Sequence, residues 1–244
     1  MSSAVLAWRQ FRFERRMFWR NPSAAFFNFA LPLLFLVLIA SAFGADRKEL
    51  NVLVPGLAGL AVMATTFTAL AFNLTFLREQ GILKRIYGTP MPTGSYFTGV
   101  IGNAVANAVV QVALVVVIGH VAYHVSWPRD WGALILFTLL GVTCFGALGV
   151  AFSHAIPNFD AAPAYTNAVF LPAIFISGVF YDANNLPAVL SGIAEALPLK
   201  HVIDGLSGGL VTGQGVSHHL TALGVILAWT AVGLFFAIAK FRWE

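Results

Sequence analysis

The sequence predicts an all-α protein that crosses a membrane several times, in a single domain spanning residues 1–244. Hydrophobic residues make up 59% of the chain and charged residues only 10%, against about 45–50% and about 25% in a typical soluble domain. The charges are clustered, and the apolar runs between them approach the roughly 20 residues that a helix needs to cross a bilayer. The single cysteine, Cys144, excludes an intramolecular disulfide and a cysteine-rich metal site.

Residues 4–20 are predicted to form an amphipathic helix at the membrane interface. Four arginines recur at steps of three or four residues and so share one helical face: Arg9, Arg12, Arg16 and Arg20. A basic helix with aromatic residues on its other sides is expected to lie flat, with its arginines near anionic head groups. The helix is either only an anchor that fixes the orientation of the chain, or an anchor that also contacts a cytoplasmic partner. Asn21-Pro22 then ends the helix.

Six apolar segments are predicted to be transmembrane helices, because only helices satisfy their own backbone hydrogen bonds in lipid. They cover approximately residues 26–44, 54–77, 96–122, 132–152, 167–181 and 220–239. The fifth is short and contains Pro172 and Gly178. The first is longer than the apolar core of a typical signal peptide, so we expect it to be retained, although Arg15-Arg16 resembles a twin-arginine signal.

The distribution of lysine and arginine predicts that both termini are cytoplasmic. An even number of spans with the N-terminus inside places ten basic residues in the cytoplasm: Arg9, Arg12, Arg15, Arg16, Arg20, Arg78, Lys84, Arg85, Lys240 and Arg242. Only four fall outside: Arg47, Lys48, Arg129 and Lys200. We therefore expect a multi-pass protein of a bacterial or archaeal plasma membrane.

Residues 78–92 are predicted to form a short cytoplasmic helix and loop between the second and third spans. The helix is expected over residues 78–87, because Gly88 and Pro90 end it. Ile82, Leu83, Ile86 and Tyr87 are expected on one apolar face, and Arg78, Glu79, Lys84 and Arg85 in solvent. The segment is either an interfacial linker or a helix on which a soluble partner can push.

Residues 182–219 are predicted to form a re-entrant pair of short helices on the outer side. Their apolar stretches, residues 186–197 and 202–210, are too short to span, and they are punctuated by Pro187, Pro198, Gly205, Gly208 and Gly209. Non-helical backbone at this depth is tolerated only when it packs on protein or lines a cavity. Three carboxylates are expected at the outer surface or in a pathway: Asp182, Glu195 and Asp204.

Several kinds of chemistry are missing from the sequence. None of the four lysines is followed by Ser or Thr, so there is no phosphate-binding loop of an ATPase. No Gly-x-Ser-x-Gly motif is present, and no charged residue lies centrally in a predicted span. We therefore expect no catalytic residue, no metal ligand and no cofactor on this chain. Two alternatives stay open: a membrane-embedded enzyme or cofactor protein that uses His120, His124 and His154, and an ion-coupled secondary carrier.

Short motifs carry a resemblance to a known family. Arg78-Glu79-x-Gly81 followed by Pro90 resembles the segment after the second span of the ABC-2 type permeases, the membrane subunits of type II ABC exporters. The region after the fifth span resembles theirs at Ser177-Gly178-Val179-Phe180, Leu186-Pro187, Leu197-Pro198-Leu199 and Asp204-Gly205-Leu206. Two positions depart from the family pattern: His201 stands where an aromatic residue is common, and Ser207 where arginine is frequent.

The resemblance implies an exporter whose energy comes from another chain. Two copies of this chain, or one copy and a homologous permease, would associate in the membrane lipid and bind two copies of an ABC ATPase, which would hold ATP and magnesium. No nucleic acid is expected among the partners. The resemblance assigns ATPase coupling to Arg78, Glu79, Gly81, Leu83, Lys84, Arg85, Tyr87 and Pro90. The candidate substrate path for an amphiphilic drug, lipid or glycolipid-like molecule comprises Thr66, Asn73, Phe175, Ser177, Gly178 and Phe180, and the re-entrant region is marked by Pro187, Pro198 and Asp204.

Overall fold

A computed structural model describes residues 2–42, 46–182 and 187–240, and these residues contain helices and turns but no strand. The all-α prediction is therefore confirmed for the described part of the chain. The helices are α1 (Ser3–Arg20), α2 (Pro22–Ala42), α3 (Arg47–Met63), α4 (Ala69–Glu79), α5 (Ile82–Tyr87), α6 (Thr93–Tyr123), α7 (Trp131–Phe152), α8 (Ala162–Ile176), α9 (Ala188–Ala196), α10 (Pro198–Ser207) and α11 (Leu220–Lys240). Short π-helical segments occupy Ala64–Thr68 and Gly208–Thr212, and a 3₁₀ turn occupies Val216–His219.

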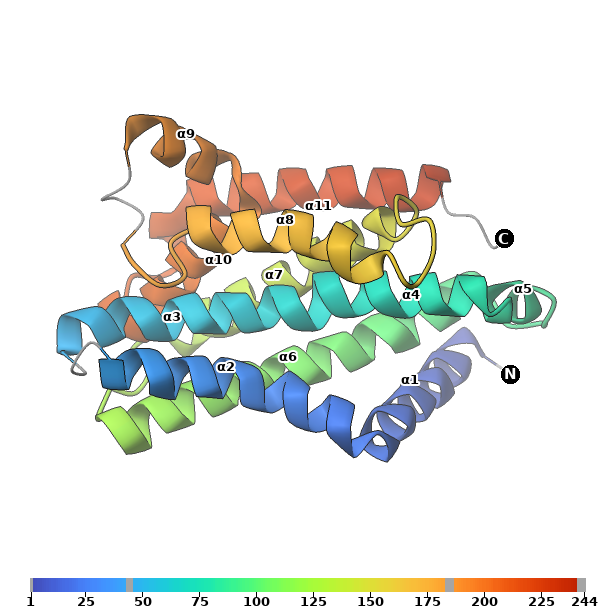
Figure 1. Ribbon diagram of the computed structural model, residues 1–244, viewed down its shortest axis with the longest axis horizontal. Coiled ribbons are helices and arrows are strands. Elements are labelled where there is room, and N and C mark those ends of the chain that lie inside the picture. The colour runs from blue at the N-terminus through green and yellow to red at the C-terminus, as the bar shows by residue number, and fades with distance from the viewer. Residues whose placement is uncertain (1, 43–45, 183–186, 241–244) are drawn as a thin grey trace.

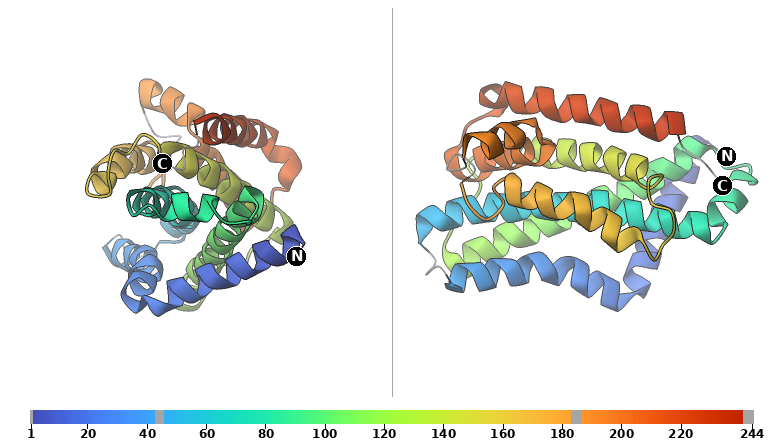
Figure 2. Two further views of the ribbon diagram at one scale, coloured as in Figure 1. Left: turned by 90° about the vertical axis from the view of Figure 1, so that its right-hand side faces the viewer. Right: turned by 45° about the horizontal axis from the view of Figure 1, so that its top comes forward.

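The long helices form a bundle with two distinct ends (Figure 1). At one end, which we name the α5 end, α5 lies near the beginning of α1 and the end of α11 (Figures 1 and 2). At the opposite end, which we name the α9 end, α9 lies on the same side of the bundle as the beginning of α3. The five predicted cytoplasmic arginines of α1 and the basic residues of α5 therefore lie toward one end, and the basic residues at the start of α3 lie at the other.

Four helical segments are long and apolar enough to cross a membrane: residues 47–79, 93–123, 131–152 and 216–239. The first of these is a continuous rod, because a π-helical turn joins α3 to α4 without a break. The apolar part of α2 and the whole of α8 are shorter. At about 1.5 Å per residue, the 15 residues of α8 extend roughly 22 Å, less than the roughly 30 Å of a bilayer core. The six-span count thus stays a prediction.

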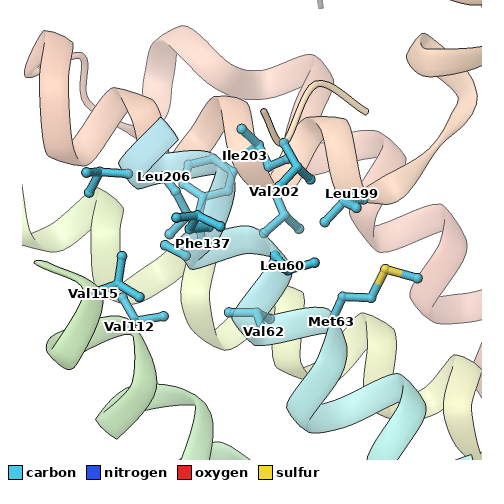
Figure 3. Close-up of a cluster of buried hydrophobic side chains, with 14 of the residues drawn as sticks. Leu60, Val62, Met63, Val112, Val115, Phe137, Leu199, Val202, Ile203 and Leu206 are labelled. Atoms are coloured by element: carbon cyan, nitrogen blue, oxygen red, sulfur yellow. The ribbon is translucent and has the colours of Figure 1, made fainter. Parts of the chain in front are cut away.

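Toward the α9 end, the interior of the bundle contains α10, which packs against α3, α7 and α11. Leu199, Val202 and Leu206 of α10 are almost fully buried and face Leu60 of α3 and Phe137 of α7 (Figure 3). Gly205 makes this packing possible, since a Cβ there would lie 2.2 Å from the Phe137 ring. This ten-residue helix is thus enclosed by protein, as the re-entrant prediction requires.

The structure corrects the bounds of two predicted segments. The helix expected at residues 167–181 is α8, which ends at Ile176, and the following residues turn instead. The helix expected from residue 202 begins at Pro198, because proline suits the first helical turn, where an N–H would have no partner. Three residues to which the sequence analysis gave a position lie outside the described residues: Gly44, Leu186 and Arg242.

The glycines at the end of α10 allow close packing and do not end the helix there. Gly208 and Gly209 continue α10 as a π-helical turn. The carbonyl of Gly209 accepts hydrogen bonds of 2.9 Å from the amides of Arg129 and Asp130, just before α7. These bonds fix the start of α7 against the end of α10.

Gly56→Ala is expected to destabilise the bundle, because an added Cβ would lie 1.9 Å from the carbonyl oxygen of Val179. Overpacking of this kind costs about 1–3 kcal/mol, and here the opposing atom belongs to the backbone and cannot rotate away. The thermal unfolding of the detergent-solubilised protein measures the effect. Gly224→Ala is the matched control, since nothing lies within 4 Å of its added Cβ; equal melting temperatures for the two variants would contradict the expectation.

Candidate functional site

The helix α5 is set apart from the rod α3–α4 by a single glycine. Gly81 has a φ of +65°, a left-handed conformation that glycine adopts without strain, and it reverses the chain after Glu79. The helix therefore begins at Ile82 and not at Arg78, which corrects the prediction of one helix over residues 78–87. Arg78 and Glu79 instead close the C-terminal turn of α4.

One face of α5 is buried and the other is exposed. Leu83 is only 1% exposed and belongs to an apolar cluster with Leu74 of α4 and Tyr96 of α6. Lys84, Arg85 and Pro90 are exposed. Tyr87 was predicted on the apolar face with Ile82 and Ile86, but it is 66% exposed. The result is a short helix with a fixed base and an exposed surface of Lys84, Arg85 and Tyr87.

Arg78 and Glu79 attach the end of α4 to the loop between α7 and α8. Arg78 Nη1 donates to the carbonyl of Ser153 at 3.0 Å, and Nη2 donates to the carbonyl of Ile156. The backbone amide of Phe159 donates to Glu79 Oε2 at 2.5 Å. Both residues were predicted to be solvated. In the structure Arg78 is half-buried and Glu79 is exposed, and both hold a loop about 80 positions further along the chain. We name the three hydrogen bonds made by these two side chains the loop clamp.

The ring of Phe159 strengthens the same attachment. Its centroid lies 5.4 Å from that of Phe76 and 6.3 Å from that of Phe72, both on α4, in edge-to-face geometry. The loop that leads into α8 is thus held to α4 by polar and aromatic contacts together. A displacement of α4 would be transmitted to the beginning of α8.

The helix α1 packs along α6, near the α5 end (Figure 2). Its four stripe arginines are exposed, as predicted: Arg9, Arg12, Arg16 and Arg20. Arg15 lies off the stripe, donates to Asn107 Oδ1 of α6 at 2.5 Å and covers the ring of Trp19 at 5.7 Å. The hydroxyl of Ser95 donates to the carbonyl of Ser3 at 3.0 Å. The basic stripe of α1 is thus presented outward from a helix that is firmly seated.

The predicted substrate-path residues do not form one site. Thr66 is buried and donates to the carbonyl of Val62 at 2.6 Å, whereas Asn73 lines a cavity of about 630 Å³ between α1, α4 and α6. The other four lie at the end of α8 or after it. Phe175 is 55% exposed, Ser177 is buried, and Gly178 has a φ of +76°.

Phe180 packs half-buried against Phe35 of α2, with ring centroids 6.0 Å apart. Gly178 allows the sharp turn that returns Val179 to Gly56 of α3. Thr66 and this turn therefore have packing roles in the described structure, while Asn73 faces open space.

One re-entrant marker, Asp204, belongs to a charged cluster that the sequence analysis did not predict. Lys200 Nζ lies 3.0 Å from Glu195 and 2.9 Å from Asp204, and so links α9 to α10. His201 Nε2 lies 2.8 Å from the carbonyl of Glu195. Pro187 and Pro198 stand immediately before α9 and at the start of α10. A lysine flanked by acidic residues at i−5 and i+4 was the available signal for this cluster.

The histidines of the alternative enzyme hypothesis are dispersed. His120 Nδ1 lies 2.7 Å from the carbonyl of Val125, and its ring stacks 4.3 Å from Trp127. Within the described ranges, no group of three or more His, Cys, Asp or Glu side chains is placed to hold a metal ion.

A model of the ABC-2 type transporter family matches residues 3–211, most of the chain. The chain belongs to this family. This ABC-2 type transporter is 23% identical over 222 residues to Nodulation protein J of Rhizobium meliloti (strain 1021), covering 88% of this chain and 84% of that protein. It is 22% identical over 189 residues to the linearmycin resistance permease protein LnrN of Bacillus subtilis (strain 168), covering 78% of this chain and 49% of LnrN.

The match between this ABC-2 type transporter and a third relative covers fewer residues. The probable multidrug ABC transporter permease YbhS of Escherichia coli (strain K12) is 29% identical over 90 residues, which are 36% of this chain and 24% of YbhS. The resemblance inferred from the short motifs is thus confirmed. The chain is a multi-pass membrane permease of this family, and the family implies an ABC transporter with an ATPase partner.

Arg78→Ala is expected to loosen the loop of residues 153–161, because it removes the guanidinium that donates to the carbonyls of Ser153 and Ile156. A hydrogen bond from a charged group stabilises by roughly 1.5–3 kcal/mol, so amide exchange in this loop should accelerate about tenfold or more. Hydrogen–deuterium exchange of the protein in nanodiscs measures this. Arg85→Ala removes an exposed arginine nearby and should leave the loop protected; unchanged protection in Arg78→Ala would show that the loop is ordered by other contacts.

Proposed function

We propose that this chain is the permease subunit of an ATP-driven exporter and that its α5 end faces the cytoplasm. Two copies, or one copy and a homologous permease, would bind two copies of a separate ABC ATPase and move an amphiphilic substrate outward across the plasma membrane. The observation that carries the proposal is α5 itself: an exposed basic and aromatic helix fixed at the end of a membrane-length rod. A rigid attachment of this kind suits the transfer of force from a soluble partner.

The charge distribution supports the proposed orientation. Most lysines and arginines of the described helices lie toward the α5 end, in α1, α4 and α5. Cytoplasmic segments of membrane proteins carry such an excess. The exposed stripe of α1 would then lie among the anionic lipids of the inner leaflet.

The loop clamp supports a route by which ATP-driven motion reaches the membrane. A push on α5 acts on the end of α4, and Arg78 and Glu79 carry the displacement to the loop before α8. Three of the proposed path residues, Phe175, Ser177 and Gly178, lie at the other end of α8. The rod and α8 would move together and open the path alternately to the two sides.

The names of the relatives support export of an amphiphile. LnrN is a resistance permease and YbhS is a probable multidrug permease, and resistance requires movement out of the cell. Apolar residues dominate the outward-facing surfaces of α2 and α8, where Leu34, Phe35 and Phe175 are exposed. Such surfaces would face lipid in the membrane, where the apolar part of an amphiphile would also lie.

Arg85→Glu combined with Tyr87→Ala is expected to uncouple the permease from its ATPase while leaving the fold intact, because both side chains are exposed. ATP-dependent transport of a fluorescent amphiphile in proteoliposomes containing the cognate ATPase should fall at least tenfold, about 1.4 kcal/mol of lost interaction. Co-purification of the ATPase should weaken in parallel.

Lys48→Glu serves as the control, since it reverses an exposed charge at the opposite end of the rod. It should retain both transport and ATPase binding. Full transport and full co-purification in the α5 double variant would overturn the assignment of α5 as the docking helix.

A further inference from the structure

The cavity lined by Asn73 differs from the other cavities of the bundle in size and chemistry. Its volume is about 630 Å³, whereas three cavities along α7 measure about 360–430 Å³ and are lined almost wholly by apolar side chains. Five asparagines line it, from α2, α4, α6 and the junction between α1 and α2: Asn21, Asn28, Asn73, Asn103 and Asn107. We name it the asparagine cavity.

The polar groups of the asparagine cavity are five amides, the hydroxyl of Thr65 and a single carboxyl. No lysine or arginine is among the described residues that line it. The carboxyl is Glu14 of α1, which accepts a hydrogen bond of 2.8 Å from Gln10. Burial raises the pKa of Glu14, and the bond from Gln10 opposes that rise. The lining therefore offers donors and acceptors in similar numbers and little fixed charge.

One of these amides has a buried oxygen without a partner. Asn103 Oδ1 is shielded from solvent and accepts no hydrogen bond from any described residue. Leaving a buried polar atom unpaired costs about 1–3 kcal/mol. Its neighbour one helical turn along α6, Asn107, is by contrast occupied by Arg15. Asn103 lines the cavity with other atoms of its side chain, and this oxygen has almost no accessible surface there.

The backbone of the rod is also irregular where it borders the cavity. The π-helical turn of residues 64–68 supplies Thr65 to the lining, and Ala69 follows immediately. π-Helical turns recur at functional sites because they shift side chains out of helical register. Ala69 is exposed, between half-buried Thr68 and buried Leu70.

The remaining walls are apolar and reach the rim. Phe18, Leu70 and Val100 line the cavity, and Met17, Phe76 and Phe159 are exposed at 50%, 40% and 39%. An amphiphile needs both surfaces: amides for a head group and aromatic or aliphatic side chains for a tail.

We propose that the asparagine cavity binds the uncharged, hydroxyl- or amide-bearing head group of an amphiphile at the α5 end of the membrane. Its place in export, as the site that collects substrate from the inner leaflet, rests on the proposed function. The binding itself depends only on this chain.

The lining distinguishes this head group from charged ones. An anionic group such as sulfate or phosphate would meet Glu14 and find no cation among the described lining residues. A quaternary ammonium cannot donate to any amide oxygen of the lining, since such a cation carries no N–H or O–H. A hydroxyl or amide group can both donate to and accept from the asparagine amides.

Protection of an introduced thiol tests the proposal. Ala69→Cys places a reporter on the cavity wall, and the native Cys144 is buried. The full chain in lipid nanodiscs is labelled with N-ethylmaleimide in the presence of octyl glucoside, octyl sulfate or octyltrimethylammonium, which share one tail. At ten times its Kd, octyl glucoside should slow the labelling about elevenfold, and the two charged probes should not.

Two variants on the reporter background assign the protection to the cavity. Asn103→Leu should abolish protection by octyl glucoside, and Asn73→Leu, a second wall residue, provides the same test if the first variant folds poorly. Asn51→Leu changes an exposed asparagine of α3 outside the cavity and should leave protection intact. Val109→Cys reports from the apolar cavity between α6 and α7, where the head group should make no difference.

Equal protection by all three probes, or protection that survives Asn103→Leu and Asn73→Leu, would overturn the proposal. So would the absence of protection by octyl glucoside. None of these results would bear on the α5 docking experiment, because labelling needs no ATPase. Conversely, an α5 variant that still transports would overturn the proposed docking helix and leave the head-group site standing.

Discussion

The hydrogen bonds from Arg78 to the carbonyls of Ser153 and Ile156 satisfy backbone groups beyond the end of α7. Backbone that leaves a helix near a membrane must find partners in the protein, because lipid offers none. Elsewhere the backbone itself supplies such partners: the carbonyl of Gly209 accepts hydrogen bonds from the backbone amides of Arg129 and Asp130, just before α7. The irregular segments of this bundle are thus held by specific contacts, and those contacts determine which helices move as a unit.

The loop clamp makes one unit of the rod α3–α4, the loop of residues 153–161 and the start of α8. At the α9 end, Lys200 binds Glu195 and Asp204 and makes another unit of α9 and α10. The close approach of Gly56 to Val179 then joins the end of α8 to the rod a second time. Because α8 is fixed to the rod near both of its ends, the two can tilt together more readily than they can slide past each other.

The sequence was sufficient for what depends on local pattern. Long apolar runs predicted the rod, α6, α7 and α11, and Gly88 with Pro90 predicted the end of α5. It was insufficient where a residue's partner lies far along the chain. Arg78 and Glu79 had the composition of a solvated helix end, and nothing local indicates a loop about 80 residues away.

Glycine gave the most ambiguous signal for the same reason. Gly205, Gly208 and Gly209 were interpreted as breaks, since glycine weakens an isolated helix. In the bundle they are places where α10 meets Phe137, His219 and the backbone before α7. Gly81 and Gly178 do turn the chain, and both have positive φ. Only the neighbouring elements, which the sequence does not specify locally, distinguish the two uses.

Phe159 connects the two functional features of the α5 end. Its amide is held by Glu79 in the loop clamp, and its ring forms part of the rim of the asparagine cavity. The ring also packs on Phe72 and Phe76, which line the same cavity from α4. A change in the angle between α4 and the loop must therefore change the shape of the rim. Force applied at α5 and a head group held near Asn103 would then act on the same few side chains, so that each can influence the other without a further moving part.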